Sequence, residues 1–308
     1  MTAAEQLRAR LGWRPAARPQ QPVLFINPRS GGGTAIRLAL ADRARDLGIE
    51  PVVLGPTDDL ASLVRDAVGR GADALGMAGG DGSLATVAAV ACAHDLPFAC
   101  VPAGTRNHFA RDLGVLRHDV VGALAAFTDD LERRIDVGEV NGSVFLDNVI
   151  LGFYGDAVRR EEYRDARLRT LLVAAREALG PRAPVSGLVV ADDRGDEHRD
   201  PAVVLISNNP YAIDRAVARE TRPRLDSGRL GVVVLHRPPA RRTDRAWTTS
   251  DLDVTVPGPV YAGRDGEAVT LEPPLRFTIR PMALRVRISS RHPGASPAAR
   301  LTSLDPRR

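Results

Sequence analysis

The stretch Gly79-Gly80-Asp81-Gly82-Ser83 decides the fold prediction, because an apolar run (residues 74–78) precedes it and a helical pattern (residues 84–91) follows it. A strand, a glycine turn and a helix start in this order form an anion site, since backbone N–H groups point at the ligand and the helix dipole favours negative charge. Asp81 would repel phosphate unless a cation such as Mg²⁺ bridges the two. The stretch therefore predicts a metal–nucleotide site. A glycine turn with an aspartate cap is the simpler alternative.

Strand-like and helix-like segments alternate through the first half of the chain. Apolar strands are predicted at residues 23–26, 52–54, 74–78 and 97–101, with helices between them and a last helix at about 118–127. Polar glycine loops follow three of these strands, at residues 27–34, 79–83 and 102–114. Ligands bind beyond the carboxyl ends of parallel strands, so the three loops should meet on one rim. We predict an α/β domain with an open, mostly parallel, Rossmann-like sheet.

The pattern changes near residue 134. Residues 135–150 predict a β-hairpin with a tight Asn141-Gly142 turn, and residues 156–179 predict an arginine-rich helical excursion. Short β runs follow at residues 187–191, 203–207, 230–235, 252–256, 268–271, 276–279 and 284–288. Regular short strands with Pro and Gly turns predict an antiparallel β-sandwich.

The domain prediction has four parts. An α/β nucleotide-binding domain spans residues 22–134, and a β-sandwich spans residues 135–290. Residues 1–21 are interpreted as a frayed tail and linker rather than a membrane-surface helix. Residues 291–308 are expected to be a loosely ordered tail.

The composition limits the chemistry. All 42 basic residues are arginine, which excludes a Walker lysine or a Schiff-base lysine. The net charge of +4 suits anionic lipid or nucleic acid, although a generic basic surface is favoured and the 4% aromatic content disfavours nucleic acid. No apolar run reaches the roughly 18 residues of a membrane span. Cys92 and Cys100 lie in apolar settings, which predicts buried thiols. Together with the charges near the N-terminus, the short apolar runs predict a cytoplasmic protein.

Five motifs occur in a fixed order along the chain. They are NPRSGGG at 27–33, GGDGS at 79–83, PAGTRNHFARDLG at 102–114, LDSGRLGVVVL at 225–235 and DGE at 265–267. In these motifs the chain resembles the diacylglycerol kinase catalytic-domain family, which includes bacterial lipid kinases and sphingosine kinases. The resemblance implies ATP-dependent phosphorylation of a lipid hydroxyl with Mg²⁺, in an interdomain cleft whose sandwich side contacts the acyl chains. The protein would then associate peripherally with the inner face of the membrane.

The resemblance also implies roles for individual residues. Glu267 would be the catalytic base, and Asp81 would hold Mg²⁺. The nucleotide-binding candidates are Asn27, Pro28, Arg29, Ser30, Gly31, Thr57, Gly79, Gly80, Gly82, Ser83, Thr105 and Asn107. The ligands of a structural metal loop would be Ser227 and the backbone carbonyls of Arg224 and Arg229, but Ser227 stands where the family usually has an acidic residue.

Several alternatives stay open at this point. An NAD kinase would share the GGDG stretch, and a silent nucleotide- or lipid-binding relative would share the fold. The DGE stretch has a second interpretation as a plain hairpin turn, and Asn107 has one as a helix cap. The ends of two predicted strands, at residues 147–148 and 207–209, are weaker substrate-side candidates. Neither the particular lipid nor a homodimer follows from the sequence.

Overall fold

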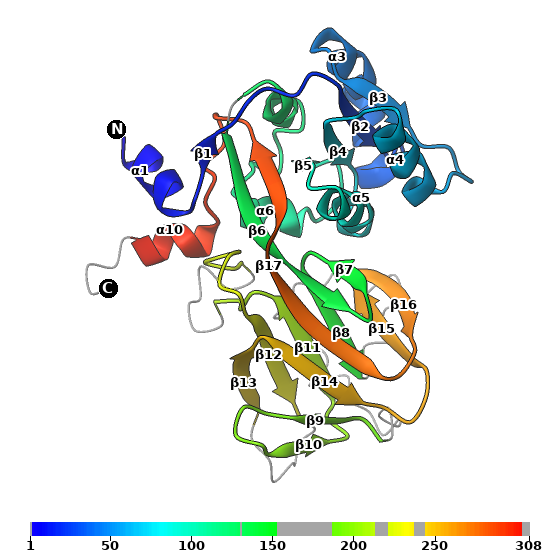
Figure 1. The fold of residues 1–308 in the computed structure, drawn as a ribbon, viewed down its shortest axis with the longest axis vertical. Coiled ribbons are helices and arrows are strands. Elements are labelled where there is room, and N and C mark those ends of the chain that lie inside the picture. The colour runs from blue at the N-terminus through cyan, green and yellow to red at the C-terminus, as the bar shows by residue number, and fades with distance from the viewer. Residues whose placement is uncertain (1, 130, 153–186, 213–220, 237–243, 304–308) are drawn as a thin grey trace. The chain divides into compact units, whose positions relative to one another are not determined.

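The computed structural model describes residues 2–129, 131–152, 187–212, 221–236 and 244–303. The chain divides into two compact units. Unit 1 comprises Met1–Ile135, Thr221–Leu225 and Met282–Arg308. Unit 2 comprises Asp136–Glu220 and Asp226–Pro281. Two strands, β6 (Leu131–Val140) and β17 (Leu275–Ile288), therefore contribute residues to both units (Figure 1).

Unit 1 contains a parallel sheet in the order β3-β2-β4-β5. Its strands are β2 (Pro22–Ile26), β3 (Glu50–Val53), β4 (Ala74–Ala78) and β5 (Pro97–Val101). Every residue of β2, β4 and β5 is buried, as continuous apolar runs predict for a sheet covered on both faces. The end of β17 adds a further parallel strand beside β5. The α/β class with a mostly parallel sheet is thus confirmed.

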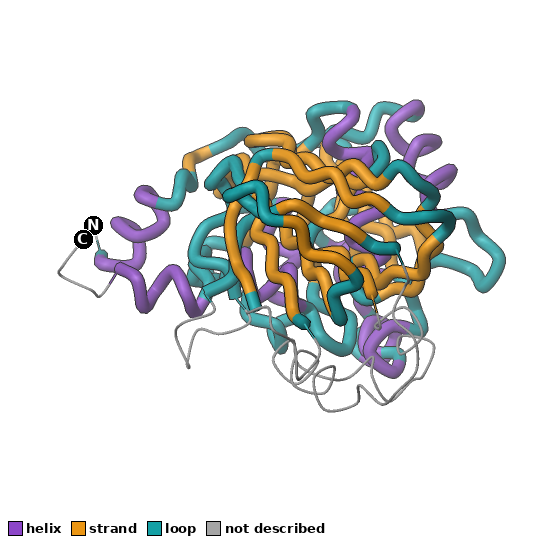
Figure 2. Tube along the Cα trace, turned by 90° about the horizontal axis from the view of Figure 1, so that it is seen from below, coloured by secondary structure: helices purple, strands orange, loops and turns teal. Residues whose placement is uncertain are grey.

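Short helices connect the strands of unit 1. They are η1 (Ser30–Gly32), α2 (Thr34–Arg37), α3 (Leu40–Asp46), α4 (Leu60–Gly69), α5 (Asp81–Ala93), α6 (His108–Leu113) and η2 (Gly122–Phe127). Asp59 caps α4 by accepting a hydrogen bond from the Ala61 N–H. Within the described ranges, no helix is long and apolar enough to cross a membrane. Figure 2 shows these helices and the strands in separate colours.

Helices are present near both ends of the chain, where a frayed tail and a loosely ordered tail were expected. Helix α1 (Ala3–Arg10) begins with a capping box, and α10 (Pro297–Ser303) lies near the other end of the chain. Arg8 donates hydrogen bonds to carbonyl oxygens of the C-terminal segment, and the Trp13 Nε1–H donates to the Gly294 oxygen at 2.7 Å. Trp13 is buried, so the two ends stabilise each other within unit 1.

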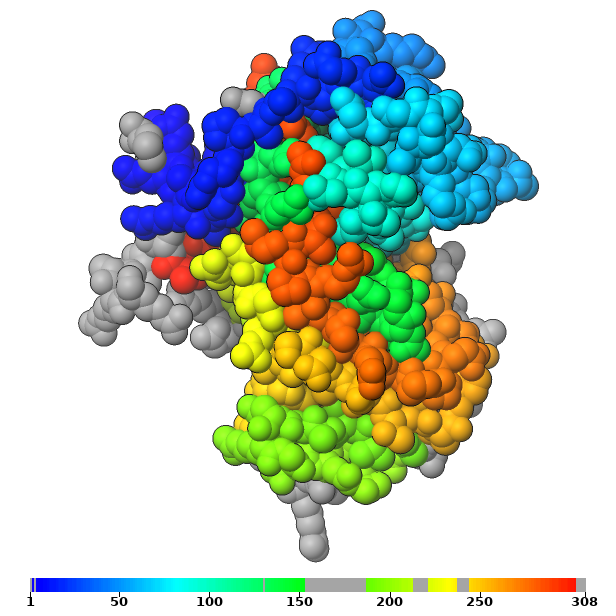
Figure 3. Space-filling view, viewed as in Figure 1, coloured from blue at the N-terminus to red at the C-terminus, as the bar shows by residue number. Residues whose placement is uncertain are grey.

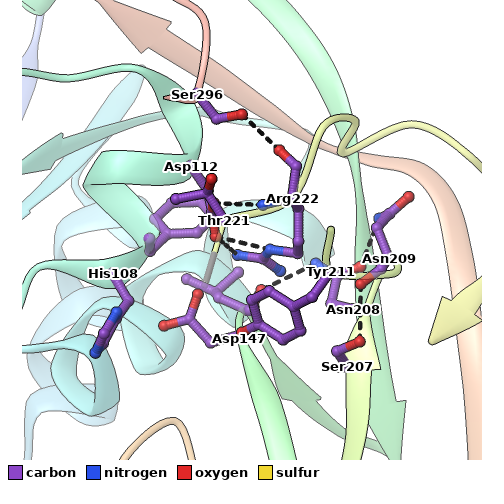
Figure 4. A network of polar contacts seen from close by, with 12 residues as sticks. His108, Asp112, Asp147, Ser207, Asn208, Asn209, Tyr211, Thr221, Arg222 and Ser296 are labelled. Carbon is purple, nitrogen blue, oxygen red and sulfur yellow. Dashed lines mark hydrogen bonds and ion pairs between the residues drawn. The ribbon is translucent and has the colours of Figure 1, made fainter. Parts of the chain in front are cut away.

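Residues 221–225 were predicted in the sandwich but belong to unit 1. The reason is a buried ion pair between Arg222 and Asp112 (Figure 4). The Asp112 carboxylate accepts the Arg222 backbone N–H at 2.9 Å and its Nε–H at 2.8 Å. The Ser296 hydroxyl donates to the Arg222 carbonyl at 2.6 Å. The C-terminal part of β17 was likewise predicted in the sandwich, and residues 285–287 pair with β5 instead.

Removing one member of this buried pair should be costly. Asp112→Ala leaves a buried guanidinium without its carboxylate, and we expect the free energy of unfolding to fall by about 3–5 kcal/mol. Denaturant unfolding measures this loss. The control Asp46→Ala removes an exposed carboxylate from the same unit and should change stability by less than about 0.5 kcal/mol. Similar stabilities of the two variants would contradict the structural role of the pair.

Unit 2 is antiparallel, as predicted. One sheet has the order β13-β12-β11-β8-β15-β16 and another group pairs β10-β9-β14-β17. Besides parts of β6 and β17, its strands include β8 (Asn148–Gly152), β9 (Val189–Ala191), β10 (Glu197–Arg199), β11 (Val203–Asn208), β12 (Leu230–Leu235), β13 (Arg245–Thr249), β14 (Asp251–Thr255), β15 (Val260–Arg264) and β16 (Glu267–Leu271). Their apolar faces share one core that includes Val149, Val204 and Phe277. The β9–β10 hairpin forms part of the green surface of this unit in Figure 3.

The predicted hairpin at residues 135–150 is present. β6 turns at Asn141 and Gly142 into β7 (Ser143–Phe145), and both turn residues have positive φ, 48° and 79°. One further prediction differs from the structure. The runs at 276–279 and 284–288 are parts of the single strand β17. The helical excursion at 156–179, with its arginine run, lies outside the described residues.

Candidate functional site

The three glycine loops of unit 1 lie against one another. A β carbon at Gly31 would come within 2.4 Å of the Ala103 carbonyl oxygen, so the first loop packs on the third. A β carbon at Gly104 would come within 2.8 Å of the Gly79 oxygen, so the third loop packs on the second. Only glycine permits these approaches. The predicted meeting of the loops on one rim is therefore observed.

The first loop is held by its own polar groups. The Asn27 side chain accepts the Arg29 N–H at 3.0 Å, and the Thr34 hydroxyl donates to the Gly31 oxygen at 2.7 Å. The Asn27 N–H donates to Ala78 at the end of β4, which ties this loop to the start of the second. Arg29 is exposed, and most of the loop is partly exposed. The loop thus offers backbone N–H groups and one guanidinium to a ligand.

Asp81 is the first residue of α5 and is half-buried beside the third loop. Its carboxylate accepts the N–H groups of His108 and Phe109 at 3.4 and 3.5 Å, which are long hydrogen bonds. Burial raises the pKa of Asp81, while the nearby charges of His108 and Arg106 act in the opposite direction. A bound cation would stabilise the ionised form of this carboxylate, because burial has removed part of its solvation by water.

Asp81 fits Mg²⁺ as one ligand among several, with the others supplied by phosphate and water. Mg²⁺ commonly binds one or two carboxylates together with substrate phosphates and keeps several waters. Across the described part of the chain, no group of three or more His, Cys, Asp or Glu side chains could hold a metal ion. Asp81 therefore suits a metal that arrives with a phosphate ligand rather than a metal held by protein alone.

Asn107 braces the third loop. Its buried side chain accepts the Gly104 N–H at 2.9 Å and donates to the carbonyl oxygens of Pro102 and Gly104 at 3.1 and 2.8 Å. It precedes α6 with a φ of 53° but makes no capping hydrogen bond with its side chain. These three bonds give the amide a structural role, and a nucleotide contact stays a prediction.

The remaining nucleotide candidates are partly or fully exposed, apart from the buried Gly79. Thr105 is exposed in the third loop, and Thr57 is exposed in the loop after β3. A β carbon at Gly80 would meet nothing within 4 Å, so open space lies directly above this backbone. Gly82 and Ser83 form the first turn of α5 and are partly exposed. These positions leave room for a ligand at the rim.

In unit 2, the DGE stretch is a two-residue hairpin turn. Asp265 and Gly266 have φ values of 48° and 81°, and Arg264 pairs with Glu267 across β15 and β16. Glu267 is exposed at the first position of β16. The plain-turn interpretation is therefore correct for the backbone, and the same turn presents the Glu267 carboxylate at the surface of its unit.

Asp265 has a role that the sequence analysis did not find. Its buried carboxylate accepts the backbone N–H groups of Leu146, Asp147 and Asn148 at 2.9, 2.8 and 3.2 Å. These bonds fix the turn to the segment between β7 and β8. An Asp-Gly turn is a local signal, but nothing local shows that its carboxylate binds a segment almost 120 residues away.

Replacing this carboxylate should loosen the turn. In Asp265→Asn, the amide nitrogen cannot accept an N–H, and we expect a loss of about 2 kcal/mol in the free energy of unfolding, because a buried donor loses its partner. Thermal unfolding with calorimetry measures the loss. Glu267→Gln, two residues away and exposed, serves as the control and should keep the stability of the parent protein. An undiminished stability in Asp265→Asn would contradict the bracing role.

Ser227 is the predicted side-chain ligand of the structural metal loop, and it carries no charge. The Ser227 hydroxyl and N–H both donate to the Asn209 side-chain oxygen, at 2.5 and 2.8 Å (Asn209 is drawn in Figure 4). Ser227 and Arg229 belong to unit 2 and Arg224 to unit 1. A serine hydroxyl used in this way brings no negative charge, whereas hard cations favour carboxylates. These residues therefore do not fit a structural cation site.

The strand-end candidates in unit 2 also make structural contacts. The Asn148 amide donates to the Tyr211 hydroxyl at 3.0 Å, and the Ser207 hydroxyl donates to the backbone carbonyl oxygen of Asn209 at 2.8 Å. The Asn208 amide donates to the carbonyl oxygens of Asp136 and Leu146. These bonds brace the strands of this unit, and a contact with substrate stays a prediction.

The parallel sheet of unit 1, with its three converging glycine loops, is joined in one chain to an antiparallel β unit. Residues 21–140 match the model of the diacylglycerol kinase catalytic domain family, which confirms the resemblance seen in the motifs. The chain is 32% identical to a diacylglycerol kinase of Mycobacterium tuberculosis over 135 residues, or 42% of each protein. It is 33% identical to a probable YegS-like lipid kinase of Pseudomonas aeruginosa over 150 residues, 47% of this chain and 48% of the relative. The matches to these relatives thus span less than half of their length.

Other relatives extend along most of the chain. A probable YegS-like lipid kinase of Pseudomonas savastanoi is 27% identical over 93% of this chain and 99% of its own length. A crystal structure of a putative diacylglycerol kinase from Bacillus anthracis superimposes with a TM-score of 0.69 and 17% identity, covering 89% of this chain and 99% of that one. The structural likeness shows the fold. The names of the sequence relatives support a family of lipid kinases.

Proposed function

We propose that this protein is an ATP-dependent lipid kinase that transfers the γ-phosphate of ATP to the hydroxyl of a neutral lipid such as diacylglycerol. The observation that carries the proposal is the meeting of three glycine loops beside Asp81, within the segment that matches the family model. Backbone N–H groups and glycine positions of this kind suit phosphate. A carboxylate among them suits a phosphate-bound metal.

Each proposed residue has a definite task. The loops orient the phosphates through backbone N–H groups, and Arg29 supplies positive charge in a chain without lysine. Asp81 holds Mg²⁺, which neutralises charge on the phosphates when it is bound. The lipid oxygen forms its bond to the γ-phosphorus as the bond from that phosphorus to the bridging oxygen of ADP breaks. Glu267 accepts the hydroxyl proton. The interdomain cleft that the family resemblance implies stays a prediction.

The proposed setting is the cytoplasm, with reversible contact at the inner face of the membrane. A lipid substrate must be met at a bilayer, and none of the described helices is long and apolar enough to cross one. The arginine excess favours anionic surfaces, since each basic side chain near one contributes about 1 kcal/mol. A homodimer stays an open alternative.

Transfer of labelled phosphate from ATP with Mg²⁺ tests the proposal directly. We expect product with diacylglycerol or a similar neutral lipid, formed faster on vesicles that contain anionic lipid and more slowly as salt is raised. A sphingoid base and NAD are assayed in parallel. Phosphorylation of NAD alone would establish the NAD kinase alternative. ATP binding without turnover on any acceptor would establish a silent nucleotide-binding protein.

A further inference from the structure

A cavity of about 510 Å³ lies in unit 1, and it shares only Arg111 and Gly114 with the loops that were considered for nucleotide binding. One wall is formed by the end of α6 and the following residues, 114–119. The other wall is formed by Pro293, Pro297 and Arg300. The proposed transfer of phosphate assigns no role to this cavity.

The two walls are fixed to each other by the backbone. Gly114 has a φ of 76°, and a β carbon there would lie 2.1 Å from the Ala295 nitrogen, so the segments pack without room for a side chain. The Gly294 N–H donates to the Gly114 oxygen at 3.2 Å, and the Leu116 N–H donates to the His292 ring at 3.3 Å. The cavity therefore lies between two segments that are braced against each other.

The charged residues of the lining are mostly positive. Arg111, Arg117 and Arg300 line the cavity against a single acidic residue, Asp119. The Asp119 carboxylate accepts the Gly122 N–H at 2.9 Å and so is engaged at the start of η2. Arg117 uses one of its five N–H groups in a bond to His118. The lining thus carries an excess of guanidinium groups, which bind phosphate well.

The rest of the lining is apolar. Val115, Leu116, Pro293 and Pro297 contribute hydrocarbon surface, and Leu116 is 48% exposed. An apolar surface adds no binding free energy for a free phosphate ion. A phosphate attached to an acyl glycerol would contact both the arginines and this apolar surface. We propose that this cavity binds an anionic phospholipid, with the phosphate at the arginines and the first part of the chains against Val115, Leu116 and the prolines.

Binding without ATP tests this proposal, so its result is separate from the kinase assay. Calorimetry would use dioctanoyl phosphatidic acid below its aggregation concentration, with dioctanoylglycerol and inorganic phosphate as comparison ligands. We expect phosphatidic acid to bind most tightly. The double variant Arg117→Ala with Arg300→Ala should weaken its binding by at least about tenfold, because two of the cavity's cations are lost.

Two further variants sharpen the test. Arg45→Ala with Arg65→Ala removes the same charge from exposed positions on α3 and α4 and should leave binding within about twofold. Leu116→Ser should weaken binding of phosphatidic acid but not of inorganic phosphate. Equal losses of affinity for phosphatidic acid in the two double variants would overturn the cavity as the binding site. Equal affinity for inorganic phosphate, or no effect of Leu116→Ser, would overturn the phospholipid as its ligand.

Discussion

Asp81→Asn is expected to lower turnover at least about a hundredfold, on the scale at which metal and transition-state charge terms act. The substitution keeps the shape of the side chain and removes the charge that Mg²⁺ requires. Steady-state kinetics with saturating lipid and varied Mg²⁺ measures the effect, and higher Mg²⁺ should not restore activity. Turnover within about threefold of the parent protein would contradict the metal role.

The pH dependence of the stability of Asp81→Asn distinguishes a loss of catalysis from a loss of folding. The pKa of Asp81 is raised above its ordinary value of 3.8, so the folded protein holds this proton more tightly than the unfolded chain. Stability contributed by the group is then lost as pH rises from about 3.8 through the raised pKa. At a pH above the raised pKa the ionised carboxylate lowers the stability of the fold, so Asp81→Asn should melt no lower than the parent there. The difference in melting temperature between Asp81→Asn and the parent should vanish below the ordinary pKa of 3.8. A lower melting temperature at neutral pH would show that lost activity reflects damage to the fold.

Local patterns explain which parts of the fold could be predicted from the sequence. Strands β2, β4 and β5 are continuous apolar runs, and the glycine loops directly follow them. Strands β10, β13 and β15 were missed because they are short and carry charged or small residues such as Glu197 and Arg245. Their pairing comes from neighbours in the sheet, which no local pattern encodes.

Long-range contacts explain the other differences. Trp13 and Gly294 are 281 positions apart, and Asp112 and Arg222 are 110 apart. A tail rich in arginine and proline resembles a linker until its partner is known. The same limit applies to the candidate site. Glycine spacing predicted the loops that meet, but only the folded backbone shows that the Asn107 side chain holds the third loop in place.

Glu267→Gln tests the proposed chemistry most directly, because a glutamine keeps the size of the side chain but cannot take a proton. Glu267 is exposed at the start of β16, so the substitution removes no buried contact. We expect turnover to fall by about a hundredfold or more, on the scale of general-base catalysis. If the carboxylate acts only in the transition state, kcat and kcat/KM should fall together, with the KM for lipid almost unchanged.

The comparison with Asp265→Asn separates the base from the turn that presents it. Asp265 holds the hairpin through three backbone N–H groups, so its variant should lose stability and lose activity only as far as the turn moves. Glu267→Gln should instead keep its melting temperature, and its ATP affinity by calorimetry should stay within about threefold, because a base contributes to the reaction and not to nucleotide binding. Nearly normal turnover in Glu267→Gln would reduce the DGE stretch to a structural turn. Loss of ATP binding in that variant would assign Glu267 to the nucleotide and leave another residue to accept the proton.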